Sequence, residues 1–283
     1  MNIGNRNTGR ENFFMGKRLR IAVFIVFFIG IVLTAFRYFK FVSKTVYEES
    51  ASHLTEVFHQ SNNVLNELAN KNLTYLHMWG EYLKKVSDES EIRDYIDKAQ
   101  EEAGFLYFYF LSADGNYKML TGEAGYLGLQ ENLEDKITLG EDIITNAVVP
   151  GKQQMLVFAS PQSHGSYQGF EYDAIAIAYE NADIVDVLDI SAFNGNAKSY
   201  VVHPDGRVVI DHSFEAWGTV YNFFGVLREH SNISEKEILE LSEKFKERRT
   251  DTMLVNLDGS NYYLVYGSSE CQDWIFLGLV QAD

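Results

Sequence analysis

The sequence predicts an α+β protein in which a long N-terminal helix, preceded by one transmembrane helix, carries two lobes built on antiparallel sheets. Three observations predict this class. A charge-free apolar run lies near the N-terminus, a long segment with helical spacing of apolar residues follows it, and a strand–turn–strand pattern then occurs twice in the same order. The chain of 283 residues is long enough to bury a core in each lobe.

The apolar run comprises residues 21–36 and contains no charged side chain. A bilayer core requires roughly 20 apolar residues in a helix. Arg37 and Lys40 follow directly, and such side chains reach the interface while their stems stay in the apolar layer. We therefore expect a transmembrane helix over 21–41. A cleavable signal peptide would show small residues after the run, where this chain has bulky and basic ones.

Charge predicts the orientation of this helix. Of the 24 Lys and Arg and the 40 Asp and Glu, residues 1–44 hold eight and one, so the remainder is strongly acidic. The positive-inside rule places the basic tail, 1–20, in the cytoplasm of a cell-membrane protein and the residues after about 41 outside the cytoplasm. An acidic exterior excludes nucleic acid as a partner. Cys271 is the only cysteine, and an exported domain without disulfides suits a bacterium.

Residues 42–104 are expected to form a stalk and long helix region. From Val46 to Val86, apolar residues recur at steps of three and four, and no Gly or Pro precedes Gly80 in this segment. The apolar stripe suits a dimer seam near the membrane as well as a core face further along the helix. We expect a homodimer.

A second helix is predicted directly after the long one. Asp88 followed by Glu91 is a capping-box pattern, which satisfies free backbone N–H groups at a helix start. Gly104 ends the helix, because glycine readily adopts the left-handed conformation found just after helices.

The first lobe is predicted over residues 105–190, where the apolar period changes from 3.6 to 2. An aromatic strand over 105–111 meets the Asp114-Gly115 turn, and the chain returns over 117–121. The remaining predicted elements are a loop or short helix over 122–139, a helix over 139–149, strands over 155–160 and 174–179 joined by a polar link, and a short helix over 183–190.

The second lobe is predicted over residues 191–283, where the order of elements repeats. It begins with two strands around an Asp205-Gly206 turn. The further predicted elements are helices over 222–229 and 234–248, the latter with Ser234 and Glu237 as a capping box, strands over 253–255 and 262–266 around an Asp258-Gly259 turn, and a last strand over 274–280.

This order of elements resembles the double Cache extracytoplasmic sensor domain, in which a long outer helix carries two tandem PAS-like antiparallel-sheet lobes. The resemblance covers about residues 40–283. Four stretches carry it: 155–161 resembles a strand that ends in a Ser-Pro pair, 182–188 the helix that links the lobes, and 200–211 and 273–278 the first hairpin and the last strand of the second lobe.

The resemblance implies a small-molecule ligand, of unknown identity, bound by the membrane-distal lobe over 105–190, with the lobe over 191–283 proximal to the membrane. Such domains belong to bacterial signal-transduction proteins in which a second membrane helix and an output domain follow, here after Asp283. The proximal lobe is most similar to sensors of diguanylate cyclases, so a cyclase is the first expectation and a (hybrid) histidine kinase or chemoreceptor the alternative. A membrane-anchored protein-interaction module without a small-molecule ligand is an alternative of another class.

Catalytic motifs are missing from the sequence: it contains no Gly-x-Ser-x-Gly, His-Glu-x-x-His or P-loop pattern. The best group of His and acidic residues is His203, Asp205, Asp211 and His212, and in a hairpin these flank a turn in which Asp205 has an ordinary turn role. We therefore expect no enzyme activity in this chain, no metal site and no cofactor.

Tyrosines occur in the first lobe where an ordinary core carries Val or Leu. Tyrosine offers an apolar wall and a hydroxyl, which suits a small polar ligand in a concave site. The Arg-x-Trp-Tyr element of the amino-acid-binding branch of the resembled family is missing, which leaves the ligand class open. The predicted ligand-binding residues are Tyr107, Tyr109, Tyr126, Phe158, Ser160, Tyr172, Asp173 and Tyr179.

Overall fold

The computed structural model describes residues 8–129, 133–148, 154–187, 197–211, 217, 220–269 and 272–282. The chain divides into two compact units, residues 1–53 and residues 54–283. Each unit is described by itself.

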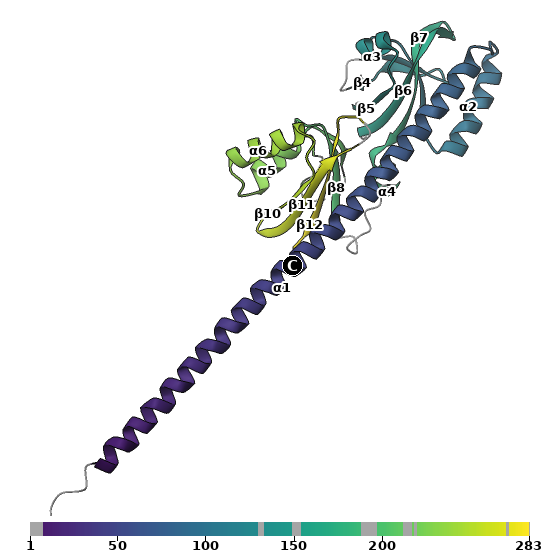
Figure 1. The fold of residues 1–283 in the computed structure, drawn as a ribbon. Helices are drawn as coiled ribbons and strands as arrows, with labels where there is room; N and C mark the ends of the chain where they lie inside the picture. Colours follow the sequence, from purple (N-terminus) through teal and green to yellow (C-terminus); the bar gives the residue numbers. More distant parts are fainter. Residues whose placement is uncertain are drawn as a thin grey trace, which may run out of the picture. The chain divides into compact units, whose positions relative to one another are not determined.

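Residues 8–53 of the first unit belong to helix α1 (Thr8–Leu83), and the remaining residues of α1 belong to the second unit (Figure 1). The predicted transmembrane segment over 21–41 is helical throughout, and the side chains of 21–26 lie outside the described residues. Phe28 and Phe36 are 66% and 69% exposed. Among the described residues, no helix has a stretch that is both long and apolar enough to cross a bilayer.

The two helices predicted before the first sheet are confirmed. The helix expected from Val46 to Val86 is the C-terminal part of α1, and α2 (Glu89–Ala103) follows it. The Asp88 carboxylate accepts hydrogen bonds from the backbone N–H groups of Ser90 and Glu91, as an N-cap residue does. Gly104 has φ 77° and its N–H donates to the carbonyl of Gln100, which closes the helix.

The distal lobe is built on a seven-stranded antiparallel sheet with the order β3-β2-β1-β7-β6-β5-β4. Leu133 and Ile137 of α3 pack against this sheet. The elements of the lobe are β1 (Tyr107–Leu111), β2 (Asn116–Met119), β3 (Ala124–Tyr126), β4 (Gly128–Leu129), α3 (Leu133–Leu139), β5 (Ile143–Val148), β6 (Gln154–Tyr167) and β7 (Phe170–Glu180).

Two predictions for the distal lobe are wrong. The segment predicted as a helix over 139–149 forms β5, because its apolar residues pair with β6 from Ile143 onward. The polar link predicted between the two later strands is the extension of a long β6–β7 hairpin. Its turn residues Gln168 and Gly169 both have positive φ, 50° and 73°, which is the conformation of a two-residue type I′ turn.

The proximal lobe contains a five-stranded antiparallel sheet with the order β10-β11-β12-β8-β9. The predicted strand–turn–strand unit around Gly206 is confirmed, as is the reciprocal capping box of Ser234 and Glu237. The elements are α4 (Asn181–Val187), which connects the lobes, β8 (Ala197–Val202), β9 (Val208–Asp211), α5 (Phe223–His230), α6 (Glu235–Lys246), β10 (Asp251–Leu257), β11 (Ser260–Ser268) and β12 (Ile275–Gln281). Residues 188–190 of the predicted linking helix lie outside the described residues.

One hydrophobic core unites the C-terminal part of α1 with both sheets. Leu65 and Leu76 of α1 are fully buried, and Trp79 is 4% exposed. The same cluster includes Phe108 of the distal sheet and Phe276 of the proximal sheet. The helix therefore serves both lobes as a common packing surface.

The two Asp-Gly turns of the proximal lobe provide a matched pair of variants. Gly206 and Gly259 have φ 84° and 87°, so alanine at either position is expected to cost about 1–2 kcal/mol in backbone strain. A Cβ at Gly206 would also lie 2.5 Å from the ring of Phe224, whereas Gly259 has no atom within 4 Å of that position. Gly206→Ala is therefore expected to destabilise by about 1–3 kcal/mol more than Gly259→Ala in urea unfolding. Equal losses would contradict the contact with Phe224.

Candidate functional site

The two faces of the distal sheet carry side chains of different size. On the face that packs against α1 and α2, the central strands place large residues such as Phe108, Phe158 and Ile177. These residues are at most 3% exposed. This face is filled by the long helices.

The opposite face, here called the tyrosine–alanine face, combines tyrosines on β1 with alanines on β7 and at one position of β6. These residues are Tyr107, Tyr109, Ala159, Ala174, Ala176 and Ala178, and the same cluster also holds Met155 and Val157 of β6. Tyr107 lies opposite Ala178, and Tyr109 lies opposite Ala176, which has Ala159 on its other side. The alanines, here called the alanine floor, therefore lie beside the two tyrosines, here called the tyrosine wall, across three neighbouring strands.

Tyr117, Leu127 and α3 cover part of the tyrosine–alanine face. The ring of Tyr109 lies 5.9 Å from that of Tyr107 and 4.9 Å, edge-on, from that of Tyr117. Burial, together with these two phenols, raises the pKa of Tyr109, so its hydroxyl remains a hydrogen-bond donor at all physiological pH values. Residues 130–132 and 149–153, which connect β4 to α3 and β5 to β6, lie outside the described residues.

Three of the predicted ligand-binding residues lie on the helix-facing side instead. Phe158 and Tyr179 belong to the core shared with α1. Ser160 lies two residues after Phe158 in β6 and therefore on the same side of the sheet. The Tyr179 hydroxyl donates to Asn72 Oδ1 at 2.9 Å and lies 3.3 Å from the carbonyl of Ala103. Tyr179 therefore ties the sheet to both long helices.

The other three predicted residues lie away from both faces' centres. Tyr126 is 62% exposed on the edge strand β3. The ring of Tyr172 lies 4.9 Å from that of Phe110, tilted by 48°, close to the turn of the β6–β7 hairpin. Asp173 accepts hydrogen bonds from the N–H of Ala113 at 2.9 Å and from His164 Nδ1 at 3.1 Å. The eight predicted residues therefore do not form one site.

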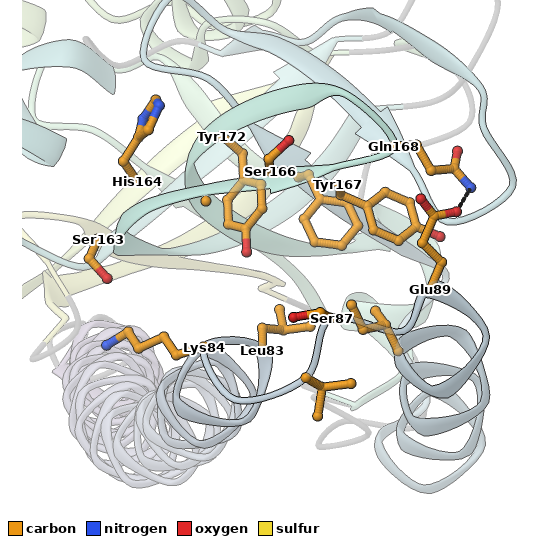
Figure 2. A pocket seen from close by; sticks show the side chains of 14 residues that line it. Leu83, Lys84, Ser87, Glu89, Ser163, His164, Ser166, Tyr167, Gln168 and Tyr172 are labelled. Carbon is orange, nitrogen blue, oxygen red and sulfur yellow. Dashed lines mark hydrogen bonds between the residues drawn. The ribbon is translucent and has the colours of Figure 1, made fainter.

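A pocket, here called the hairpin pocket, lies where the end of α1 meets the β6–β7 hairpin (Figure 2). Its volume is about 360 Å³. Figure 2 shows Tyr167 and Tyr172 on the strand side of the pocket and Leu83 and Ser87 on the helix side. Glu89 closes one end, where its carboxylate accepts a hydrogen bond from Gln168 Nε2 at 3.2 Å.

Charges at the rim of the hairpin pocket are already paired within the protein. The hydrogen bond to Asp173 and the nearby Glu171 raise the pKa of His164, which favours the imidazolium at the rim. The Lys84 ammonium donates to Glu81 at 2.6 Å. A ligand in this pocket would compete with these partners, so we rank the tyrosine–alanine face above it.

The alanine floor was missed by the sequence analysis, although its signal is visible. The run Ala174-Ile175-Ala176-Ile177-Ala178 alternates small and large residues with the period of a strand.

His203 and Asp205 lie at the Gly206 turn, while His212 is outside the described residues. Within the described part of the chain, no three His, Cys, Asp or Glu side chains are placed to hold a metal ion.

The structural role of Tyr179 predicts a stability loss on removal of its hydroxyl. Tyr179→Phe leaves Asn72 Oδ1 buried without this donor, which is expected to cost about 1–3 kcal/mol in chemical unfolding. Tyr126→Phe is the control, since an exposed tyrosine is expected to change stability by less than about 0.5 kcal/mol. Equal changes in the free energy of unfolding of both variants would exclude a stabilising role for the Tyr179–Asn72 hydrogen bond.

No protein-family model matches this sequence, and no curated protein matches it. Solved structures of similar fold exist. The ligand-binding domain of the Pseudomonas aeruginosa amino acid chemoreceptor PctB, in complex with L-Arg, has a TM-score of 0.57 and 15% identity, covering 83% of this chain and 97% of that one. The extracellular domain of the putative histidine kinase mmHK1S-Z3 has a TM-score of 0.56 and 13% identity, covering 81% and 94%.

A third similar structure is the sensory domain of the Campylobacter jejuni chemoreceptor Tlp3 with isoleucine bound. It has a TM-score of 0.53 and 9% identity, covering 85% of this chain and 96% of that one. The fold expected from the resemblance to double Cache domains is thereby confirmed.

Proposed function

Because the chain has the fold of extracellular sensor domains, we propose that it is the ligand-sensing region of a bacterial transmembrane signalling protein. The observation that carries this proposal is the size difference between the faces of the distal sheet. Where the helix-facing side has Ile175 and Ile177, the tyrosine–alanine face has Ala174, Ala176 and Ala178. Protein cores are close-packed, so a row of small side chains beside a tyrosine wall suits a site that a ligand fills.

The chemistry of this face favours a small polar organic molecule. An alanine floor accepts an apolar part of the ligand, while the hydroxyls of Tyr107 and Tyr109 offer polar contacts at its side. Two of the three similar structures named above, those of PctB and Tlp3, contain L-Arg and isoleucine. Amino acids are therefore the first compounds to screen, although this chain lacks the Arg-x-Trp-Tyr element.

Ligand binding on the sheet is proposed to act through the long helix. A ligand shifts a conformational equilibrium only by its difference in affinity for the two states. The opposite face of the same sheet packs against Trp79 and neighbouring residues of α1, so a change in sheet curvature alters the packing on the helix. Signalling through α1 in a homodimer is part of this proposal.

For the output activity of the signalling protein, we propose only the class of protein. Chemoreceptors and histidine kinases provide the similar folds, which supports these two classes as the signalling protein. A diguanylate cyclase, the first expectation from sequence resemblance, remains compatible with the same sensor fold. This chain itself is proposed to act by binding and not by catalysis.

A thermal-shift screen of the full chain in detergent micelles tests the ligand proposal. A ligand at 100 times its Kd is expected to stabilise the folded state by about 2.7 kcal/mol, a shift of several degrees. In Ala176→Leu, the larger side chain fills the floor, so the shift should be lost while the protein remains folded.

The matched control blocks the hairpin pocket instead. In Gly165→Ala, the new Cβ would lie 2.4 Å from Tyr172 Cζ and displace the phenol that lines that pocket. The ligand shift should persist in this variant. The opposite pattern would assign the ligand to the hairpin pocket, and no shift with any compound would favour the protein-interaction module.

The N-terminal part of α1 is proposed as the membrane anchor, with the N-terminus in the cytoplasm. Exposed apolar side chains between residues 27 and 41 support it; Phe27, Leu33 and Phe41 are 67%, 59% and 68% exposed. The full chain should stay in membranes during an alkaline carbonate wash, whereas a variant lacking residues 21–41 should be released. Release of the full chain would argue against the anchor.

A further inference from the structure

Two buried side-chain amides connect the distal sheet to the proximal lobe. Asn146 Nδ2 on β5 and Gln154 Nε2 on β6 both donate to the backbone carbonyl of Val208 on β9, at 3.2 Å and 3.1 Å. Asn146 is fully buried and Gln154 is 9% exposed. We call these three residues the amide clamp.

The strands that carry the clamp also form part of the proposed ligand site. In β5, Asn146 points to the helix-facing side, and its neighbour Ala147 lies in the cluster of the tyrosine–alanine face. In β6, Gln154 alternates in the same way with Met155 of that cluster. A displacement of either strand by a ligand therefore moves a clamp residue on its other side.

The orientation of both amides is determined by their common acceptor. If either amide were turned over, its oxygen would face the Val208 oxygen, so the nitrogens must point to Val208. As a result, Asn146 Oδ1 and Gln154 Oε1 are buried and have no hydrogen-bond partner in the part of the chain that the structure describes. The clamp thus satisfies its donors and leaves its acceptors unsatisfied.

A third amide lies beside the clamp. Met155 pairs with Glu180, so the register of β6 and β7 brings Gln154 next to Asn181 at the start of α4. Asn181 is 8% exposed, and its Oδ1 also has no hydrogen-bond partner among the described residues. Unsatisfied buried acceptors oppose the close approach of the two lobes, which reduces the net gain from the two hydrogen bonds of the clamp.

The acceptor lies at an irregular point of the proximal sheet. The pairing of β8 with β9 shifts between Val201 and Val202, directly where Val208 enters the sheet. The Val208 N–H donates to the carbonyl of Tyr221 at 3.0 Å, which is outside the β8–β9 ladder. Such an irregularity lets the carbonyl turn toward the distal lobe.

We propose that the amide clamp is the releasable joint between the two lobes, and that a ligand on the tyrosine–alanine face changes how firmly β5 and β6 hold Val208. The part played by the ligand rests on the proposed function. The joint itself is independent of any ligand. Small net stability and two alternative arrangements are what a switch element requires.

Distances between spin labels on the two lobes test the joint without a ligand. In the full chain with Cys271→Ser, labels at Glu171→Cys and Lys236→Cys report on the distal and proximal lobes; these native side chains are 59% and 86% exposed. The double variant Asn146→Leu with Gln154→Met keeps the side-chain sizes and removes both donors. We expect its distance distribution to broaden by about a factor of two, with a similar melting temperature.

Gln162→Met is the matched control. Gln162 Nε2 donates to the carbonyl of Ser160 within the distal lobe, so its loss removes one amide hydrogen bond but does not touch the joint. Its distance distribution should equal that of the parent. If the double variant does not fold, Gln154→Met alone removes one donor and should still broaden the distribution.

An unchanged distance distribution in the clamp variants would overturn the proposal of a releasable joint. Equal broadening of the distribution in Gln162→Met would overturn it too. Either result leaves the ligand screen unaffected. Failure of that screen likewise leaves the joint measurable, because the labels need no ligand.

Discussion

The structure depends on the burial of one face of α1 against two sheets at once. Leu65, Leu76 and Trp79 share a single apolar core with side chains from both lobes. Helix α2 packs in the same core on the distal sheet, whereas α5 and α6 pack in a separate cluster with the proximal sheet. Among the described residues, α1 is therefore the long helix that both sheets share. Removal of apolar area from water stabilises this arrangement by about 25 cal/mol per Å², which makes the helix the common support of both lobes.

This arrangement gives the two faces of the distal sheet different roles. The helix-facing side must be filled, and Phe108, Phe158 and Ile177 fill it. The outer side is covered in part by Leu127 and by Leu133 and Ile137 of the short helix α3. The proposed ligand site lies on this side, where the side chains of β7 are small. In that proposal, a signal would reach α1 through the same strands.

Much of the fold could be predicted from local patterns. Apolar periods, turn residues and cap residues predict both capped helices, the Asp-Gly hairpins and the succession of two antiparallel-sheet lobes along the chain. All of these signals act over a few positions. The β5 strand was misjudged as a helix because its pairing with β6 is a contact across a loop. The site was predicted only in part: alternation correctly placed Tyr107 and Tyr109 together. Strand alternation gave no information on which face of the sheet the long helix would cover. Phe158, Ser160 and Tyr179 were therefore grouped with Tyr107 and Tyr109, although they lie on the opposite face.

The alanine floor has a consequence for how ligand selectivity can change over time. Main-chain hydrogen bonds hold β7 between β1 and β6 regardless of the side chains it carries. Exchange of Ala174, Ala176 or Ala178 for glycine, serine or valine would alter the depth or polarity of the floor by a few atoms and leave the ladder intact. Under the proposed function, single substitutions in this one strand would therefore change which ligand fits, without a change in the residues that pack on α1.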